Sequence, residues 1–375
     1  MNITLPKTTE PGSITVFSLI FTVLFFTVLI LKCLMFLYCH CLRPSTNLYQ
    51  RYRSTSSSKI YAVVTGATKG IGLTFAKQLA ARGFSILLVG RSRDKLIQVQ
   101  TTIHALYSTI DVQFVEIDFA KANKDSMLQL NHMLSTIDVG LLVNNVGMVL
   151  PNGLKYFTER RPENMASMCE VNMRACLLMT RLVLPKIVNR KSGGIINMSS
   201  ISGLHPTPLL TTYAATKSFV HSLSLSLSEE TSGLSNIDIL SCTPGFVATD
   251  MSYSMFGSHA AQSITTTTTT DTKSSWCSCI RIPPVITAKM CVESILNQLG
   301  NGYVHTSGHW THGVQNCMHS ITPNFILSDI THTCMRTFQN TKNKERKNGI
   351  ETKIDDEEES TLEQVGLLER NVGTN

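Results

Sequence analysis

From Lys59 onward, short apolar runs rich in β-branched residues alternate with longer stretches of helical periodicity. This alternation is typical of βαβ units, in which a helix joins two parallel strands. The pattern predicts strands at 60–65, 85–90, 112–117, 139–144, 194–199, 237–243 and 303–306. It predicts helices at 70–82, 163–189, 213–230 and 285–299, the second kinked or ended early by Pro185. The predicted fold class is therefore α/β, with a doubly wound parallel sheet.

A separate apolar stretch precedes this pattern. Residues 14–31 are uncharged and mostly apolar, and the apolar character resumes after Lys32 to about Tyr38. About 20 to 25 helical residues cross a bilayer core, so 14–38 is predicted to be a transmembrane anchor. A cleaved signal peptide is less favoured because the stretch lacks a basic start and a small-x-small cleavage site. Basic residues follow the stretch, which places the rest of the chain in the cytosol by the positive-inside rule.

These patterns define the predicted domain limits. Residues 1–13 form a short lumenal N-terminus with a sequon at Asn2, 39–58 a basic linker, and 59–335 one catalytic domain. The Thr/Ser-rich insert at 258–278 cannot pack a core and is predicted to be a mobile loop. Residues 336–375 are predicted to be a charged, disordered tail.

Composition narrows the class of protein further. A hydrophobic content of 43% excludes global disorder. Lys and Arg form no stripe interleaved with aromatic residues, so no nucleic-acid partner is expected. The 11 cysteines are odd in number and scattered, which favours a reducing compartment. The Cys277/Cys279 pair lacks a second ligand pair, so no metal site is expected. Either palmitoylation or apolar packing accounts for Cys33, Cys39 and Cys41.

A glycine-rich turn follows the first predicted strand. Glycines there let the backbone turn tightly near a pyrophosphate, and the next helix N-terminus offers free N–H groups. The strand before the turn and the helix after it favour a Rossmann-type dinucleotide site, since glycines alone also simply end strands. The predicted cofactor-binding residues of this turn are Gly66, Thr68, Lys69, Gly70, Ile71 and Gly72.

The end of the second predicted strand indicates which dinucleotide is bound. NAD sites usually place an acidic residue there to bind the ribose hydroxyls. Here the strand runs into Arg91, and no acid occurs before Asp94. Arg91 and Lys69 can pair with a 2′-phosphate. The predicted cofactor is therefore NADP(H).

Tyr213 and Lys217 stand four residues apart on a predicted helix and so share one face. A nearby ammonium stabilises a phenolate and lowers the pKa of the tyrosine toward neutrality. Ser200 lies thirteen residues before Tyr213, just past a strand end, and this spacing favours it over Ser199. The three residues predict a site for proton transfer.

Taken together, the motifs resemble the short-chain dehydrogenase/reductase family across nearly all of the chain after the linker. This resemblance implies that Tyr213 is the general acid or base, that Ser200 binds the substrate oxygen, and that Lys217 tunes Tyr213 and holds the ribose. It implies that Asn172 positions a water for proton relay. It also implies that Asp118 and Asn145 contact the adenine end of the cofactor, and that the segment ending at Thr249 lies against the nicotinamide.

Within the family, the resemblance is strongest to membrane-bound very-long-chain 3-oxoacyl-CoA reductases and 17β-hydroxysteroid dehydrogenases of types 3 and 12. The motifs that carry it are 62–68, 142–148, 182–185, 206–210 and 301–303. It implies an endoplasmic reticulum membrane location and a homodimer through the Tyr213 helix and the long helix before it. One departure is Gly245 after Pro244, where the subgroup often has tyrosine.

The expected function is NADPH-dependent reduction of a lipid ketone, with a long-chain 3-oxoacyl-CoA of fatty acid elongation favoured as substrate. A 17β-hydroxysteroid dehydrogenase acting on steroid ketones is the alternative, because the motifs of the two activities coincide. A non-catalytic NADP-binding membrane scaffold is the alternative from another class. The Thr-rich insert leaves the substrate pocket undefined.

Overall fold

The computed structural model describes residues 11–38, 45–53, 59–150, 154–234, 236–256 and 285–347. The insert at 258–278, Asn2, Cys39, Cys41, Cys277, Cys279 and the tail beyond Lys347 lie outside these ranges. The chain divides into two compact units, residues 1–45 and 46–375.

The first unit contains one described helix, α1 (Pro11–Leu37). Its described side chains are exposed and mostly apolar, among them Leu19, Phe21 and Phe25. A search of the described residues for a helix both apolar enough and long enough to cross a membrane finds none. The transmembrane anchor at 14–38 therefore stays a prediction.

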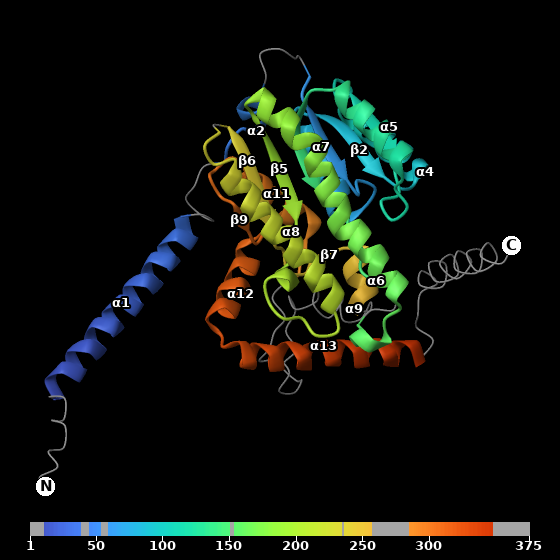
Figure 1. Cartoon of the computed structure of the whole chain (residues 1–375). Coiled ribbons are helices and arrows are strands. Elements are labelled where there is room, and N and C mark those ends of the chain that lie inside the picture. Colours follow the sequence, from blue (N-terminus) through green and yellow to red (C-terminus); the bar gives the residue numbers. More distant parts are fainter. Residues whose placement is uncertain are drawn as a thin grey trace, which may run out of the picture. The chain divides into compact units, whose positions relative to one another are not determined.

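The second unit is built on a parallel sheet of seven strands, as the alternating pattern predicts (Figure 1). Every strand pair in it is parallel. The order is β3-β2-β1-β4-β5-β6-β9, so the order reverses between β1 and β4, where doubly wound sheets place their ligands. The strands are β1 (Tyr61–Thr65), β2 (Ser85–Gly90), β3 (Val112–Glu116), β4 (Val139–Asn144), β5 (Gly193–Met198), β6 (Ile237–Cys242) and β9 (His305–Thr306).

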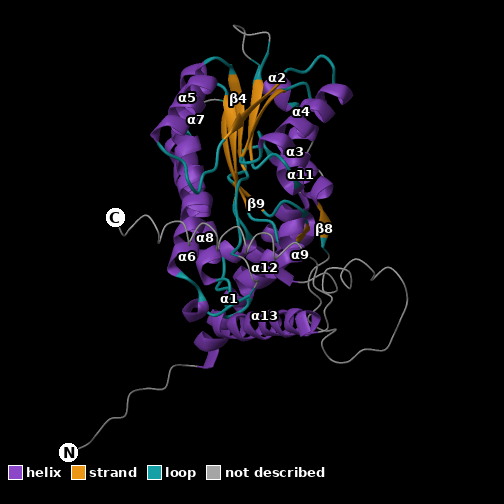
Figure 2. Cartoon of the chain, turned by 90° about the vertical axis from the view of Figure 1, so that its right-hand side faces the viewer, coloured by secondary structure: helices purple, strands orange, loops and turns teal. Residues whose placement is uncertain are grey.

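Helices cover both faces of this sheet, which Figure 2 shows edge-on. One face carries α3 (Gly70–Ala81), α4 (Arg93–Leu106) and α11 (Ala288–Gln298); the other carries α5 (Lys124–Ser135), α7 (Ala175–Arg190) and α8 (Thr211–Glu230). Each face has its own hydrophobic cluster. Because both faces are covered, all residues of β1, β2 and β4 are buried, and these strands show apolar runs without alternation.

The long helix predicted at 163–189 consists of three segments. These are α6 (Pro162–Cys169), a π-helical turn (Glu170–Arg174) and α7. Of the predicted kink or early end at Pro185, the early end is wrong, since α7 continues to Arg190. Val183 and Ile187, on either side of the proline, are fully buried. Their packing offsets the backbone hydrogen bond that a proline removes.

The structure differs from the predicted domain limits at both ends. In the predicted linker, α2 (Leu48–Arg51) is followed by the fully buried Tyr52, and Arg51 pairs with Asp238 at 2.7 Å. In the predicted tail, α13 (Asn324–Lys347) continues past residue 336 and buries Phe338. Each segment contains a buried aromatic residue, Tyr52 or Phe338, among polar residues. The polar composition of the two segments therefore gave no indication that they pack against the domain.

Shorter elements complete the C-terminal part. A two-stranded sheet pairs β7 (Val247–Ala248) with β8 (Ile286–Thr287). Helix α9 (Asp250–Phe256) follows β7 in the chain, and α12 (Trp310–Ile321) follows β9. Short 3-10 turns occur at Phe157–Glu159 and Ile201–Gly203. In both cartoon views α13 lies across the end of the domain at which the strands terminate (Figures 1 and 2).

Candidate active site

The turn after β1 is held by close backbone contacts that require glycine. A Cβ on Gly72 would lie 2.1 Å from the carbonyl oxygen of Gly66, so a side chain there is excluded. Gly66 has a φ of 65°, a region that favours glycine. Asn145, which follows β4, donates through Nδ2 to the carbonyls of Thr65 at 3.0 Å and Gly66 at 3.3 Å. In this structure, Asn145 therefore braces the turn.

Helix α3 begins immediately after this turn. Its N-cap residue, Lys69, forms no side-chain capping hydrogen bond. The first N–H groups of a helix lack partners within the helix, and they carry its positive dipole end. A glycine-rich turn before a helix start without a side-chain cap fits a pyrophosphate, so the residues here are suited to a dinucleotide.

A single cavity of about 790 Å³ runs from this turn across the carboxyl ends of the strands. Its volume lies within the range of ligand pockets in proteins. Of the predicted site residues, Gly72 and Asn172 are not part of its lining. The others all line it: Gly66, Thr68, Lys69, Gly70, Ile71, Arg91, Asp118, Asn145, Ser200, Tyr213, Lys217 and Thr249. The fold thus brings together residues from seven separate segments of the chain.

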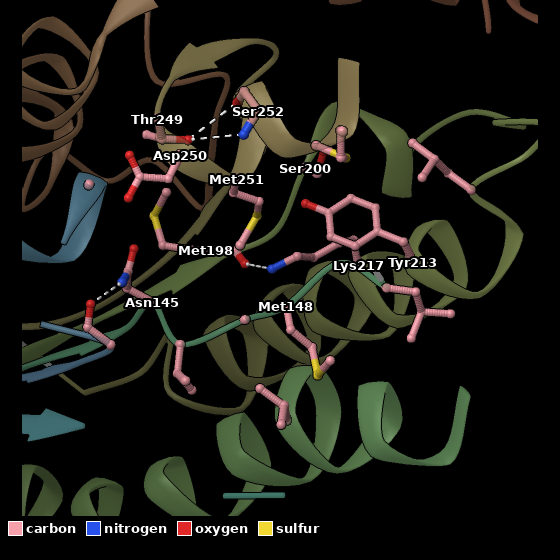
Figure 3. A pocket seen from close by; sticks show the side chains of 18 of the residues that line it. Asn145, Met148, Met198, Ser200, Tyr213, Lys217, Thr249, Asp250, Met251 and Ser252 are labelled. Carbon is pink, nitrogen blue, oxygen red and sulfur yellow. Dashed lines mark hydrogen bonds between the residues drawn. The ribbon is translucent and has the colours of Figure 1, made fainter. Parts of the chain in front are cut away.

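Ser200, Tyr213 and Lys217 converge in this cavity (Figure 3). Ser200 follows β5, and a hydrogen bond from it lowers the pKa of Tyr213. Tyr213 and Lys217 lie one turn apart on α8, with the lysine Nζ 5.7 Å from the centre of the tyrosine ring. The Nζ donates to the carbonyl of Met198 at 2.9 Å. Ser199, the rejected serine, donates instead to the Lys217 carbonyl at 2.6 Å.

Burial controls the protonation of this pair. It raises the pKa of Tyr213 to about 12, against the smaller effect of Ser200. Burial also lowers the pKa of Lys217 to about 8. The predicted net lowering of the Tyr213 pKa is therefore wrong for the protein residues alone, because loss of hydration outweighs the hydrogen bond from Ser200. The phenol is protonated at neutral pH.

Asn172 lies behind the cavity in the π-helical turn and is almost fully buried. Its Oδ1 accepts from the Met148 N–H at 2.7 Å, and its Nδ2 donates to the Met148 carbonyl at 3.0 Å and to Thr216 Oγ1 at 3.0 Å. Its side chain thus joins the loop after β4 to α8. The predicted water-relay role of Asn172 stays a prediction.

The residues predicted to contact the adenine end and its phosphates line the opposite part of the cavity. Arg91 follows β2 and is exposed, and Asp118 accepts from the N–H of Ala120 at 3.0 Å. Lys69 forms an exposed ion pair with Asp250 at 3.4 Å. Exposed pairs contribute about 0 to 1 kcal/mol, so Lys69 can exchange this partner for a phosphate at low cost.

The sequence did not reveal the apolar end of the cavity. Five methionines line the cavity, from positions far apart in the chain: Met148, Met198, Met251, Met255 and Met335. Met255 and Met335 belong to a third hydrophobic cluster, against which Tyr213 also packs. Thioether side chains are flexible and adapt to irregular apolar ligands. Among the described residues, no group of three or more His, Cys, Asp and Glu side chains could hold a metal ion.

His312 is a further residue that the sequence did not indicate. It lies on α12, is fully buried, and accepts the Gly245 N–H through Nδ1 at 3.1 Å. Burial lowers its pKa to about 4, so the ring is neutral. A Cβ on Gly245 would lie 2.9 Å from His312 Cδ2 and 3.0 Å from Gln315 Oε1. His312 therefore fills the space that a side chain at position 245 would need, which accounts for glycine there.

We expect Gly245→Ala to destabilise the chain, because overpacking of this kind costs about 1 to 3 kcal/mol. The same change in a His312→Ala background should cost much less, because the ring that meets the new Cβ is gone. Thermal unfolding of the two single variants and the double variant measures this coupling. Additive effects would contradict the proposed contact.

Comparison with known proteins adds the following. The sequence profile described as "short chain dehydrogenase" matches residues 60–258. The chain is 38% identical over 208 residues to a very-long-chain 3-oxoacyl-CoA reductase of Mycosarcoma maydis, covering 56% of this chain and 59% of that protein. It is 37% identical over 193 residues to hydroxysteroid dehydrogenase-like protein 1 of Gallus gallus, covering 51% and 56%.

Among solved structures, the fold resembles a short-chain dehydrogenase from Sphingobium yanoikuyae in complex with NADPH. The TM-score is 0.51 at 25% identity, covering 63% of this chain and 82% of that one. The matches to the two curated relatives span less than three fifths of the length of either relative.

Proposed function

Because this chain belongs to the short-chain dehydrogenase family, we propose that it is an oxidoreductase that uses NADPH to reduce a lipid ketone. The observation that carries the proposal is the convergence of Ser200, Tyr213 and Lys217 in the cavity that also contains the glycine-rich turn. A cofactor held at the turn and a carbonyl held at Tyr213 would then share one enclosed space.

The chemistry follows from the protonation of these groups. NADPH, when bound, supplies the hydride. Ser200 holds the carbonyl oxygen by a hydrogen bond, and the neutral Tyr213 hydroxyl gives its proton to that oxygen as negative charge develops on it. The pKa of Lys217 is lower than that of Tyr213, so return of a proton from the ammonium to the phenolate is favourable.

The proposed substrate is a long-chain 3-oxoacyl-CoA. Met251, Met255 and Met335 line the cavity and cluster with Tyr213, which supports an apolar chain beside Tyr213. Lys155 and Arg160 line the same cavity and could meet anionic groups of a substrate. The similarity to a 3-oxoacyl-CoA reductase supports this choice, and the similarity to a hydroxysteroid dehydrogenase-like protein keeps a steroid ketone as the second candidate.

A substrate panel tests this function. Purified full-length protein with NADPH should lose absorbance at 340 nm faster with long-chain 3-oxoacyl-CoA than with 17-oxosteroids. Faster turnover of the steroids would instead support the alternative function, a 17β-hydroxysteroid dehydrogenase. Normal NADPH binding without turnover of any ketone would favour a non-catalytic scaffold.

Cofactor choice gives a separate prediction. Arg91→Asp should shift the preference from NADPH toward NADH, because an acid in that place repels a 2′-phosphate and accepts hydrogen bonds from ribose hydroxyls. The measurement is kcat/KM with each cofactor. Lys95→Asp, which makes the same charge change at an exposed position on α4, is the matched control. An unchanged cofactor preference in Arg91→Asp would show that Arg91 does not contact the 2′-phosphate of the cofactor.

We also propose that α1 attaches the chain to the endoplasmic reticulum membrane, with the catalytic domain on the cytosolic side. The exposed apolar side chains of α1 support attachment, since such a surface is costly in water. Carbonate extraction of membranes from expressing cells tests this attachment: the chain should stay in the pellet.

We propose in addition that the chain forms a homodimer through α7 and α8. Light scattering in detergent would measure the oligomeric state.

A further inference from the structure

Helix α12 has its apolar side outward and its polar side inward. Trp310, Val314 and Met318 are 54%, 44% and 56% exposed, and their four-residue spacing places them on one face. The opposite face carries the fully buried His312. An ordinary surface helix has the reverse arrangement, with its apolar stripe against the core.

The inward side of α12 carries three polar side chains. His312 Nε2, Gln315 Oε1 and His319 Nδ1 are buried and lack a hydrogen-bond partner among the described residues. His319 packs edge-on against His205 with ring centres 5.0 Å apart. The contact between His312 and Gly245 fixes the rotation of the helix, so its apolar stripe cannot turn inward.

The outward stripe continues into the start of α13. Phe325 and Ile326 are 71% and 41% exposed. We call Trp310, Val314, Met318, Phe325 and Ile326 the α12 apolar face. Helix α12 contains no Asp, Glu, Lys or Arg. A set of large apolar side chains without interspersed charge marks a surface that meets another apolar phase.

We propose that the α12 apolar face inserts into the interfacial region of the membrane to which α1 attaches, an inference that builds on the proposed attachment. Its occupant is lipid. Helix α1 ends at Leu37, and Thr46 is already fixed to the domain by its hydrogen bond to Asn301 at 2.7 Å. The connection, residues 38–45, reaches at most about 29 Å when fully extended.

This short connection favours lipid over other occupants. A domain of about 300 residues has a radius of gyration of about 19 Å, so the tether keeps the domain within roughly its own size of the bilayer. The membrane is then present at high effective concentration. Trp310 suits the bilayer interface, where aromatic side chains are enriched. Protein interfaces, in contrast, surround their apolar centre with a polar rim, and α12 supplies no charged residue for one.

Docking in this way would have a consequence for catalysis. Helix α13 carries Phe325 and Ile326 of the face at its start and supplies Met335 to the cavity. The methionine-lined end of the cavity would therefore lie toward the bilayer, from which an apolar substrate would enter.

Fluorescence of Trp310 tests the proposal in the full-length chain. The chain has two tryptophans, so Trp276→Phe leaves Trp310 as the only emitter. The protein is reconstituted into phosphatidylcholine vesicles whose acyl chains carry bromine, which quenches tryptophan on contact. We expect Trp310 to lose most of its emission relative to vesicles without bromine, and to be protected from aqueous acrylamide.

A matched control moves the tryptophan to another exposed apolar position. Leu106 is 59% exposed on α4, which lies well away from α12 in both cartoon views (Figures 1 and 2). Leu106→Trp in a chain without Trp276 and Trp310 should escape bromine quenching. Val314→Asp with Met318→Asp should abolish quenching of Trp310 while reduction of a water-soluble ketone is unchanged.

Two results would overturn lipid docking. Trp310 open to acrylamide and unaffected by bromine would show that the face stays in water. Trp310 shielded from both would show that protein covers it, either a second copy or another segment of this chain. Carbonate extraction reports α1 attachment independently, and ketone turnover reports the proposed activity independently, so failure of either is distinguishable from failure of the docking face.

Discussion

Replacing Tyr213 with phenylalanine should abolish nearly all ketone reduction while leaving NADPH affinity almost unchanged. General acid catalysis by a positioned side chain contributes about 10² to 10⁴ in rate. Phenylalanine removes the proton donor and the hydrogen bond with Ser200, and it keeps the ring that packs against the third hydrophobic cluster. The loss should therefore appear in kcat and not in folding.

The measurement pairs steady-state kinetics with fluorescence titration of NADPH. Tyr253→Phe is the matched control, since it removes a phenol from α9 outside the cavity lining. That variant should keep full turnover. Turnover of Tyr213→Phe within tenfold of the parent chain would show that another group protonates the substrate.

The sheet could be predicted because burial leaves a direct mark on sequence. Strands covered on both faces read as apolar runs without alternation, and β1, β2 and β4 carry polar residues only at their ends, at Thr65, Ser85 and Asn144. The glycine-rich turn could be predicted for a similar reason, since the contact between Gly72 and the Gly66 carbonyl excludes any side chain. In the strands the constraint falls on every position of one short run, and in the turn it acts between residues close in sequence, so each leaves a local pattern.

Constraints between distant residues left no such mark. His312 meets Gly245 across 67 positions, and neither residue alone indicates the other. The methionines of the cavity come from a loop, the end of β5, α9 and α13, between residues 148 and 335. Their convergence depends on α13, whose polar composition near residue 336 suggests a tail although Phe338 is buried there.

Periodicity also leaves the orientation of a helix undetermined. The spacing of Trp310, Val314 and Met318 indicates an apolar stripe, and the default expectation turns such a stripe toward the core. In α12 the contacts of His312 reverse that expectation. Similarly, the spacing of Tyr213 and Lys217 predicts proximity, but the direction of their pKa shifts depends on burial, which a sequence pattern does not report.

Lys217→Met should remove activity and, below pH 8, stabilise the fold. The lysine ammonium serves Tyr213 and the proposed ribose contact, and methionine supplies neither. Yet burial lowers the pKa of Lys217 from its usual 10.5 to about 8, so the folded chain pays for keeping this charge away from water. Methionine has a similar length and no charge, although the hydrogen bond to the Met198 carbonyl is lost.

The pH dependence gives this variant a signature of its own. Between about pH 8 and 10.5, the unfolded chain retains a proton on Lys217 that the folded chain has released. Unfolding therefore takes up a proton, and this residue adds stability to the parent chain as pH rises through that window. The stability advantage of Lys217→Met over the parent should thus be largest below pH 8 and shrink toward pH 10.

Thermal unfolding of both proteins from pH 7 to 10 measures this difference in stability. Lys289→Met, at an exposed lysine on α11, is the control for loss of one charge. A stability difference that stayed constant over this range would mean that Lys217 keeps its proton in the folded chain, and that burial does not lower its pKa.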